Sequence, residues 1–430
     1  MKQRDGVSGG RTAFSYAWVI LFVIFIGQMA SFGMRSSFGA YISPWEIEFS
    51  ASRTLVTSIS TLNFIIFAIS QPFVGRLNDY LGKGIVPIVS IFLLGTSLLL
   101  ASRANQIWQV YALFGVGFSI GVAGCRDSVS GGIITNWFIK RRGFAFGLAM
   151  VGSALGQLIL APANLFFIEK FGWRTAMASL SIIIMIVVGP LFIFLLRSKP
   201  EEKGLKPYGY EEPADDEAKV DDAASVTRKT LPVLSIFKLK AFWAIAIPYF
   251  VCGFTDVGII QTHLVPMSEG KGISTAFIAL AFSLIAILNI GGSLLTGHLS
   301  DRYSRKRQLA VIYACRSLSY VLLIFLQRPA LLLLFAAIFG FVEMASVAPT
   351  HSLAVQLFDK YSVGAILVFI AVSHQMGGAA GSWVPGFLYD LTGSYTVVLA
   401  LAIVLLLGGA WLAMQIPEPD RQITEKLKNK

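Results

Sequence analysis

Apolar residues along the chain occur in long blocks that short polar breaks separate. A helix needs about 20 apolar residues to cross a bilayer, and each block is close to that length. The pattern therefore predicts twelve membrane-spanning helices, six before and six after a polar stretch at 197–240. The predicted spans are 16–38, 53–74, 84–102, 107–130, 144–168, 175–196, 241–264, 275–296, 308–327, 330–354, 363–388 and 395–416.

Composition supports a protein of the lipid bilayer and excludes other classes. Of the 430 residues, 55% are hydrophobic and only 14% are charged, against about 25% charged in an ordinary soluble domain. Such a chain is neither a soluble globular protein nor a disordered one. The net charge of +11 fits basic loops beside a membrane, so no nucleic-acid partner is expected.

The basic residues are divided unequally between the two sides of the predicted membrane. If the N-terminus is cytoplasmic, 26 of the 35 lysines and arginines fall in cytoplasmic segments, six in outer loops and three inside spans. This bias predicts that both termini face the cytoplasm, in a multi-pass protein of the cell membrane. The polar N-terminus and the long first block argue against a cleavable signal peptide.

Two loop sequences repeat at a constant spacing. GRLNDYLGKG at 75–84 matches GHLSDRYSRK at 297–306 with an offset of 222 residues, and Gly172 of FGWRT matches Gly393 of TGSYT with an offset of 221. A shared register between separate landmarks indicates two homologous halves. We therefore expect one six-helix bundle at 1–196, a cytoplasmic linker at 197–240 and a second bundle at 241–430.

The spans, the linker and the duplicated loop resemble the major facilitator superfamily. GRLNDYLGK matches the family pattern G-x-L-x-D-x-x-G-[RK], whereas the second copy has Ser304 in place of the last glycine. NWFIKRRGFAFGLAMVGSALG at 136–156 resembles the segment after span four in monocarboxylate-transporter-like members. THLVP at 262–266 and HQMGGAAG at 374–381 resemble bacterial proteins of that branch.

The resemblance implies an all-α membrane fold of two pseudo-symmetric bundles, which expose a central site to each side in turn. It also implies that the repeated loops act as gates that latch one bundle to the other. The alternative is that these loops only end helices and set topology. The gating residues would be Gly75, Asp79, Gly82, Gly297 and Asp301.

Six ionisable residues inside the predicted spans are the main candidates for function. A charge at membrane depth costs about 3 kcal/mol or more and usually faces a cavity or a partner. Three of the six are basic and three acidic, so complete internal pairing is the alternative to a functional role. The six are Arg35, Arg126, Asp127, Asp256, Arg316 and Glu343.

The arginines have different expected roles. Arg126 could bind a carboxylate through two parallel hydrogen bonds, or it could pair with Glu343 or Asp127. Arg35, near the outer end of span one, could attract an anion to the mouth or extend its charge to the membrane surface. Arg316 is expected to have a structural or snorkelling role in a lipid-facing span.

The second half supplies polar candidates on three spans. Tyr249, Asp256 and His263 share one face of span seven, and Glu343 is near the middle of span ten. Histidine titrates near neutral pH, so His374 could carry a coupling proton or could form a helix–helix hydrogen bond. The substrate-binding candidates are Arg35, Arg126, Tyr249, Asp256, His263 and Glu343, and the proton-coupling candidates are Glu343, Asp256 and His374.

No motif of an enzyme is evident. GVGFSIGVAG lies inside an apolar span, which excludes a dinucleotide fold, and there is no Walker sequence or placed nucleophile. The three cysteines match no disulfide framework or zinc site. We therefore expect no cofactor and no metal.

The leading hypothesis is a monomeric secondary transporter of a small organic anion, a monocarboxylate, driven by a proton or by exchange with a counter-anion. Export of larger apolar compounds is the alternative, suggested by 33 phenylalanines. A membrane sensor that binds without transporting is a minor alternative.

Overall fold

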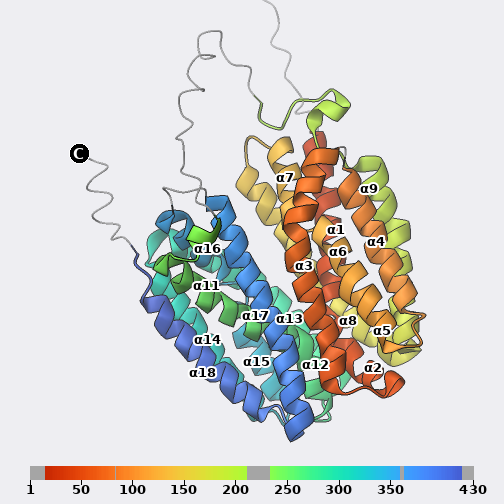
Figure 1. Ribbon diagram of the computed structural model, residues 1–430, viewed down its shortest axis with the longest axis vertical. Coiled ribbons are helices and arrows are strands. Elements are labelled where there is room, and N and C mark those ends of the chain that lie inside the picture. The colour runs from red at the N-terminus through yellow and green to blue at the C-terminus, as the bar shows by residue number, and fades with distance from the viewer. Residues whose placement is uncertain (1–14, 83, 211–232, 359–362, 419–430) are drawn as a thin grey trace, which may run out of the picture.

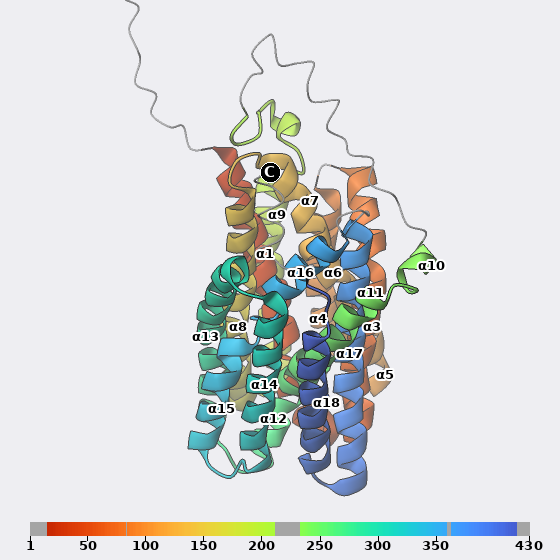
Figure 2. The same cartoon turned by 90° about the vertical axis from the view of Figure 1, so that its left-hand side faces the viewer.

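Long helices make up the computed structural model, and they stand side by side in two groups (Figures 1 and 2). The structure describes residues 15–82, 84–210, 233–358 and 363–418. Within these ranges no β-strand is formed, apart from one isolated bridge between Phe138 and Tyr208. The predicted all-α class is therefore confirmed.

The helices of the first half follow the predicted spans closely. They are α1 (Tyr16–Ser36), η1 (Phe38–Tyr41), α2 (Ile42–Phe49), α3 (Arg53–Leu81), α4 (Ile85–Ala101), α5 (Ile107–Val110), η2 (Tyr111–Phe118), α6 (Ser119–Cys125), α7 (Asp127–Trp137), α8 (Arg142–Ile183), η3 (Ile184–Val188) and α9 (Gly189–Leu195). Spans one and four are longer than predicted, because they continue through α2 and α7.

The second half has the same number of crossings. Two short elements come first, η4 (Pro200–Lys203) and α10 (Val233–Ile236). The rest are α11 (Lys240–Gly253), η6 (Phe254–Ile260), α12 (Gln261–Glu269), α13 (Thr275–Arg302), α14 (Arg305–Ile324), α15 (Pro329–Val342), α16 (Val347–Leu357), α17 (Val363–Thr392) and α18 (Thr396–Met414).

Nine stretches of helix in the described ranges are long and apolar enough to cross a membrane. One of them, Arg142–Leu195, has 54 residues and turns at Gly172, so it supplies two crossings. The shorter α4 and the 30-residue α17 complete the twelve. This is the architecture that the repeat predicted.

The repeated glycines lie in equivalent turns of the two halves. Gly172 and Gly393 both have positive φ, 78° and 66°, in the turns that precede the last span of each half. Only a residue without Cβ adopts such angles readily. Gly82 also has positive φ, 58°, whereas Ser304, its counterpart, has φ −62° and directly precedes α14. At Ser304 the second copy of the loop has a backbone conformation that residues other than glycine adopt readily, so no glycine is required there.

Each half has its own apolar core. One cluster of buried side chains is drawn from residues 17–196, and the other is drawn almost entirely from residues 236–416. The halves meet where α3 packs on α17, α8 on α13, and η1 on α12.

Hydrogen bonds between the halves lie at mid-depth and toward the end of the molecule opposite the termini, which we call the far end. There Ser43 donates to Glu269 (2.7 Å), and the backbone N–H of Thr54 donates to Asp390 (2.8 Å). Closer to mid-depth, the hydroxyls of Ser60 and Ser382 are 3.3 Å apart. The halves are thus joined at the far end.

Candidate functional site

The polar residues of spans seven and ten lie where the helices are irregular. Asp256 is in η6, a π-helical segment between α11 and α12, and Glu343 directly follows α15. A π-turn inside a membrane helix widens the backbone and is frequent at functional sites. The break between α15 and α16 likewise exposes carbonyl groups that must find partners inside the protein.

The carboxyl groups of Asp256 and Glu343 meet in the interior of the second half. They lie within hydrogen-bonding reach of each other, and each residue is only 1% exposed. The amide of Asn289 donates to Glu343 Oε2 at 2.8 Å. Among the described residues, Asp256 Oδ1 and Glu343 Oε1 have no hydrogen-bond donor. A single proton shared between the two carboxyls would satisfy both oxygens.

The first half also reaches this carboxyl pair. Gln157 of α8 is buried, and its side chain lies close enough to the Glu343 carboxyl to interact with it electrostatically. Glu343 therefore lies beside the first half, near the packed boundary between α8 and α13.

His374 of α17 completes the group of titratable residues. Its ring lies 4.7 Å from the ring of Tyr249, and donor atoms of His374, Asp256 and Cys252 lie within 4.8 Å of one another. The sequence predicted three candidates for proton coupling. The structure brings them together: Glu343, Asp256 and His374. A metal could use the same donors, but the Arg316 guanidinium donates to Cys252 Sγ at 3.0 Å and opposes a cation there.

Arg316 is buried inside the second half, so the expected snorkelling role is wrong. The residue is 0% exposed, and its guanidinium donates to the backbone carbonyls of Val342 (2.9 Å) and Glu343. These carbonyls end α15 and would otherwise be unpaired inside the membrane. Arg316 has the expected structural role, because it stabilises the break that places Glu343.

Arg126 lies at a break between α6 and α7, where its own backbone is extended. Its Nη1 donates to Gln28 Oε1 (3.0 Å) and Ser153 Oγ (2.8 Å), and its guanidinium carbon is 5.0 Å from the centre of the Phe32 ring. Pairing with Glu343 was one expectation for Arg126; the side-chain donor to Glu343 Oε2 is Asn289. The side chain of Asp127 lies outside the described residues.

Arg35 is not at an outer mouth, because span one continues beyond it through η1 and α2. Its guanidinium carbon lies 4.4 Å from the Phe64 ring centre and 4.2 Å from that of Phe67. Its Nη2 donates across the boundary between the halves to Gln375 Oε1 at 3.2 Å. Arg35 therefore links the first half to the second.

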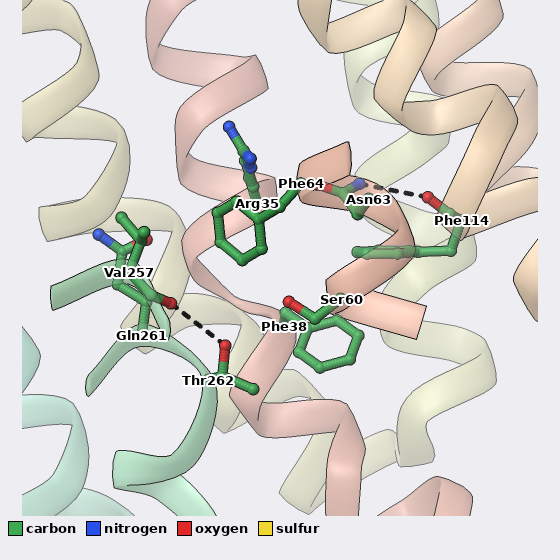
Figure 3. A pocket seen from close by; sticks show the side chains of 9 residues that line it. All are labelled: Arg35, Phe38, Ser60, Asn63, Phe64, Phe114, Val257, Gln261 and Thr262. Atoms are coloured by element: carbon green, nitrogen blue, oxygen red, sulfur yellow. Dashed lines mark hydrogen bonds between the residues drawn. The ribbon is translucent and has the colours of Figure 1, made fainter. Parts of the chain in front are cut away.

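A small hollow with a cavity volume of about 10 Å³ adjoins Arg35 (Figure 3). Arg35 and Phe64 stand on one side of it, and Gln261 and Thr262 of α12 face them from the second half. The other residues that line it are Phe38, Ser60, Asn63, Phe114 and Val257. The hollow thus combines one cation, several aromatic faces and a few neutral polar groups.

His263 lies apart from the carboxyl pair, nearer the far end. Its Nε2 is 2.8 Å from the carbonyl oxygen of Ser382 and its Nδ1 is 3.1 Å from the Tyr395 hydroxyl. A carbonyl only accepts, so Nε2 carries the proton and Nδ1 accepts from the tyrosine. Both ring nitrogens hold α12 to its neighbours, which gives His263 a structural place in this state.

The proposed gating residues differ in their surroundings. Gly75 and Gly297 lie inside α3 and α13, so they are not in loops beyond the helix ends, where the predicted spans 53–74 and 275–296 placed them. Gly82 ends α3 with positive φ, and Asp79 is exposed beside it in a hollow at the end that carries the termini. The side chain of Asp301 lies outside the described residues.

Two residues of this region were not anticipated from the sequence. Gln28 and Ser153 both bond to Arg126, and Ser153 also donates to Gln28 Oε1 at 3.2 Å. A signal was available, since Gln28 and Arg35 are seven residues apart on α1 and therefore share a helix face.

Comparisons with known proteins agree with this architecture. The sequence model of the Major Facilitator Superfamily matches residues 24–365. The chain is 25% identical to the uncharacterized MFS-type transporter YcxA of Bacillus subtilis, covering 96% of this chain and 98% of that protein. It is 26% identical to monocarboxylate transporter 12 of Rattus norvegicus, covering 78% and 71%.

Solved structures show the same fold at lower identity. The D-xylose-proton symporter superposes with a TM-score of 0.72 at 15% identity, covering 94% of this chain and 98% of that one. A bacterial homologue of the human lysosomal transporter Spinster, in an inward-facing conformation, superposes with a TM-score of 0.69 at 15% identity, covering 94% of each chain.

Proposed function

Because the chain belongs to the Major Facilitator Superfamily, we propose that it is a secondary active transporter that moves a small organic anion, a monocarboxylate, by alternating access. We further propose that a proton drives the movement. The buried pair Asp256 and Glu343 carries this proposal, since each has an oxygen without a donor among the described residues. Its relative monocarboxylate transporter 12 supports the substrate class.

The distribution of charge supports the anion. Arg35 and Arg126 of the first half both lie in helices long and apolar enough to cross a membrane, and Arg35 contacts the second half through Gln375. A guanidinium binds a carboxylate with two parallel hydrogen bonds. In the second half, protonation of the carboxyl pair would neutralise a negative charge next to the site. Anion and proton would therefore favour each other's binding.

We also propose the arrangement in the cell membrane. The excess of lysine and arginine supports cytoplasmic termini, which places the joined far end outside and the repeated loops inside. The bundle boundaries would be 1–196 and 241–430, with the linker at 197–240 in the cytoplasm. We propose that the transporter acts as a monomer and that Asp79 and Asp301 contribute to the gate on the cytoplasmic side.

The test is uptake of a radiolabelled panel of lactate, pyruvate, oxalate and benzoate into proteoliposomes, with and without a pH gradient. At least one of Glu343→Gln, Asp256→Asn and His374→Gln should abolish uphill uptake and leave counterflow exchange intact. We expect this of Glu343→Gln first, because the neutral amide permits the loaded protein to reorient but carries no coupling proton.

Glu169→Gln is the matched control, since this carboxyl is exposed on α8, away from the carboxyl pair. It should accumulate substrate as the parent does. If all three variants of the titratable group accumulate substrate uphill with the parent's pH dependence, proton coupling through them is wrong. Exchange of one anion for another would then be the better mechanism.

A further inference from the structure

Two consecutive residues of α17 contact two different parts of the site. Gln375 accepts a hydrogen bond from Arg35 in the first half, at 3.2 Å. His374 lies against Tyr249, with its ring nitrogen close to the Asp256 carboxylate. One turn of α17 therefore contacts Arg35 through Gln375 and lies close to Asp256 through His374.

The surroundings of Arg35 fix how a ligand can approach it. The rings of Phe64 and Phe67 cover the guanidinium at 4.4 and 4.2 Å. Faces covered in this way leave the N–H groups at the edge of the guanidinium plane for hydrogen bonds. Among the described residues, Nε of Arg35 has no acceptor. Arg35 can thus donate more hydrogen bonds than the one that Gln375 accepts.

The amide oxygen of Gln375 resembles half of a carboxylate. It is an sp² oxygen at the edge of a guanidinium, but it carries no formal charge and offers a single acceptor atom. A carboxylate at the same place would make two charge-assisted bonds, which are roughly twice as strong as neutral ones. A free carboxylate would therefore displace the amide.

We infer that Gln375 is a positioning residue that holds the place of the substrate carboxylate at Arg35 while the site is empty. An arriving carboxylate takes the Arg35 N–H groups and releases the Gln375 amide. The release breaks a bond between the halves and frees the turn of α17 that also carries His374. The inference rests on the proposed function, because it requires that the substrate is an organic anion.

The aromatic lining limits the rest of that substrate. Phe38, Phe64 and Phe114 line the hollow beside Arg35 (Figure 3), and its cavity volume in this state is only about 10 Å³. Aromatic faces favour an apolar body, and the Arg35 edge favours a carboxylate. The geometry thus points to a small monocarboxylate with an apolar group.

The experiment measures binding of lactate, pyruvate, oxalate and benzoate to the purified full-length protein by calorimetry. Gln375→Glu introduces a tethered carboxylate with an effective concentration on the order of millimolar. It should lower the affinity for the tightest-binding anion about tenfold or more. Gln375→Met keeps the side-chain length but removes the acceptor, and it should raise that affinity about fivefold, because no bond to Arg35 is broken.

The control makes the same change at another arginine. Gln356 accepts a hydrogen bond from Arg305 Nη1 at 2.6 Å, in α16 and far from the hollow, so Gln356→Glu should leave the affinity unchanged. Equal affinity in Gln375→Glu and the parent would overturn the inference, as would a tenfold loss in Gln375→Met. If the parent itself binds none of the four anions, the proposed function fails, which is a distinct result.

Discussion

At the scale of single residues, the site depends on how the arginine in span four is held. Arg126 donates to Gln28 and Ser153 through Nη1, and it is half-buried beside Phe32. One guanidinium nitrogen is thus engaged in orienting the side chain. The planar fork of arginine fixes the direction of all its N–H groups once one nitrogen is held.

We predict that Arg126→Lys is expressed and folded but binds the carboxylate about tenfold or more weakly. An ammonium has no fork, so it cannot bond to Gln28 and Ser153 and also present two parallel donors to a carboxylate. Calorimetry with the tightest-binding anion of the panel measures this loss.

Arg103→Lys, at an exposed position, is the control for the prediction on Arg126 and should bind normally. Normal affinity in Arg126→Lys, together with misfolding of Arg126→Ala, would instead show that Arg126 serves only to hold the first half together.

At the scale of secondary-structure elements, the breaks in the membrane helices place the site. Span ten is interrupted between α15 and α16, and the carbonyls of Val342 and Glu343 turn toward Arg316 of α14. Hydrocarbon offers no hydrogen bonds, so a break of this kind requires a donor from another helix. Arg316 is this donor, and its side chain is wholly buried.

We predict that Arg316→Met destabilises the protein by ~3 kcal/mol or more, because it leaves buried carbonyl groups without a donor. Arg316→Lys should be intermediate, since an ammonium donates from one point and not from a wide planar edge. The measurement is the thermal unfolding midpoint in detergent.

Arg328→Met is the matched control, because Arg328 is an exposed arginine at the start of α15. It should leave the midpoint close to that of the parent. A midpoint for Arg316→Met equal to that of Arg328→Met would show that the break in span ten does not depend on Arg316.

At the scale of the whole molecule, the contact at the far end sets which side of the site is closed. Asp390 at the end of α17 accepts hydrogen bonds from the backbone N–H groups of Arg53 (3.1 Å) and Thr54 (2.8 Å) at the start of α3. A carboxylate at a helix N-terminus is stabilised by the helix dipole. One half thus caps a helix of the other.

The charge of Asp390 makes this contact depend on pH. Partial burial acts to raise the pKa of Asp390, but hydrogen bonds from Thr54 and the Arg53 backbone lower that pKa below its ordinary value. The joined state therefore binds fewer protons than the separated state, so acid weakens the contact. The loss begins below the ordinary aspartate value of about 3.9, and the contact is complete at neutral pH.

We predict that Asp390→Asn lowers the population with a joined far end roughly fivefold at neutral pH, because the amide keeps an acceptor but loses the charge. Distances between spin labels at Ser50→Cys and Ser394→Cys report that population. Glu48→Gln is the control, since Glu48 pairs with Arg174 (2.8 Å) inside the first half. Unchanged distances in Asp390→Asn would contradict a latch at this residue.

Several features of the site could be predicted from the sequence, and others could not. Asp256, Glu343 and His374 were identifiable one by one, because a titratable group in an apolar span is costly and therefore conspicuous. The surroundings of Arg316 were not, because its carbonyl partners are 26 and 27 residues away on another helix. The helix break that exposes those carbonyls has no mark in the hydrophobic pattern.

The sequence by itself determined the twelve crossings, the two related halves and the turns at Gly172 and Gly393. These follow from local properties, the cost of polar residues in hydrocarbon and the freedom of glycine at positive φ. Only the tertiary structure decided which polar groups meet. Arg35 and Gln375 are separated by 340 residues, and Asp256 meets Glu343 only because η6 packs near the break after α15. Such pairs depend on the packing of helices against one another, which no local pattern of apolar residues encodes.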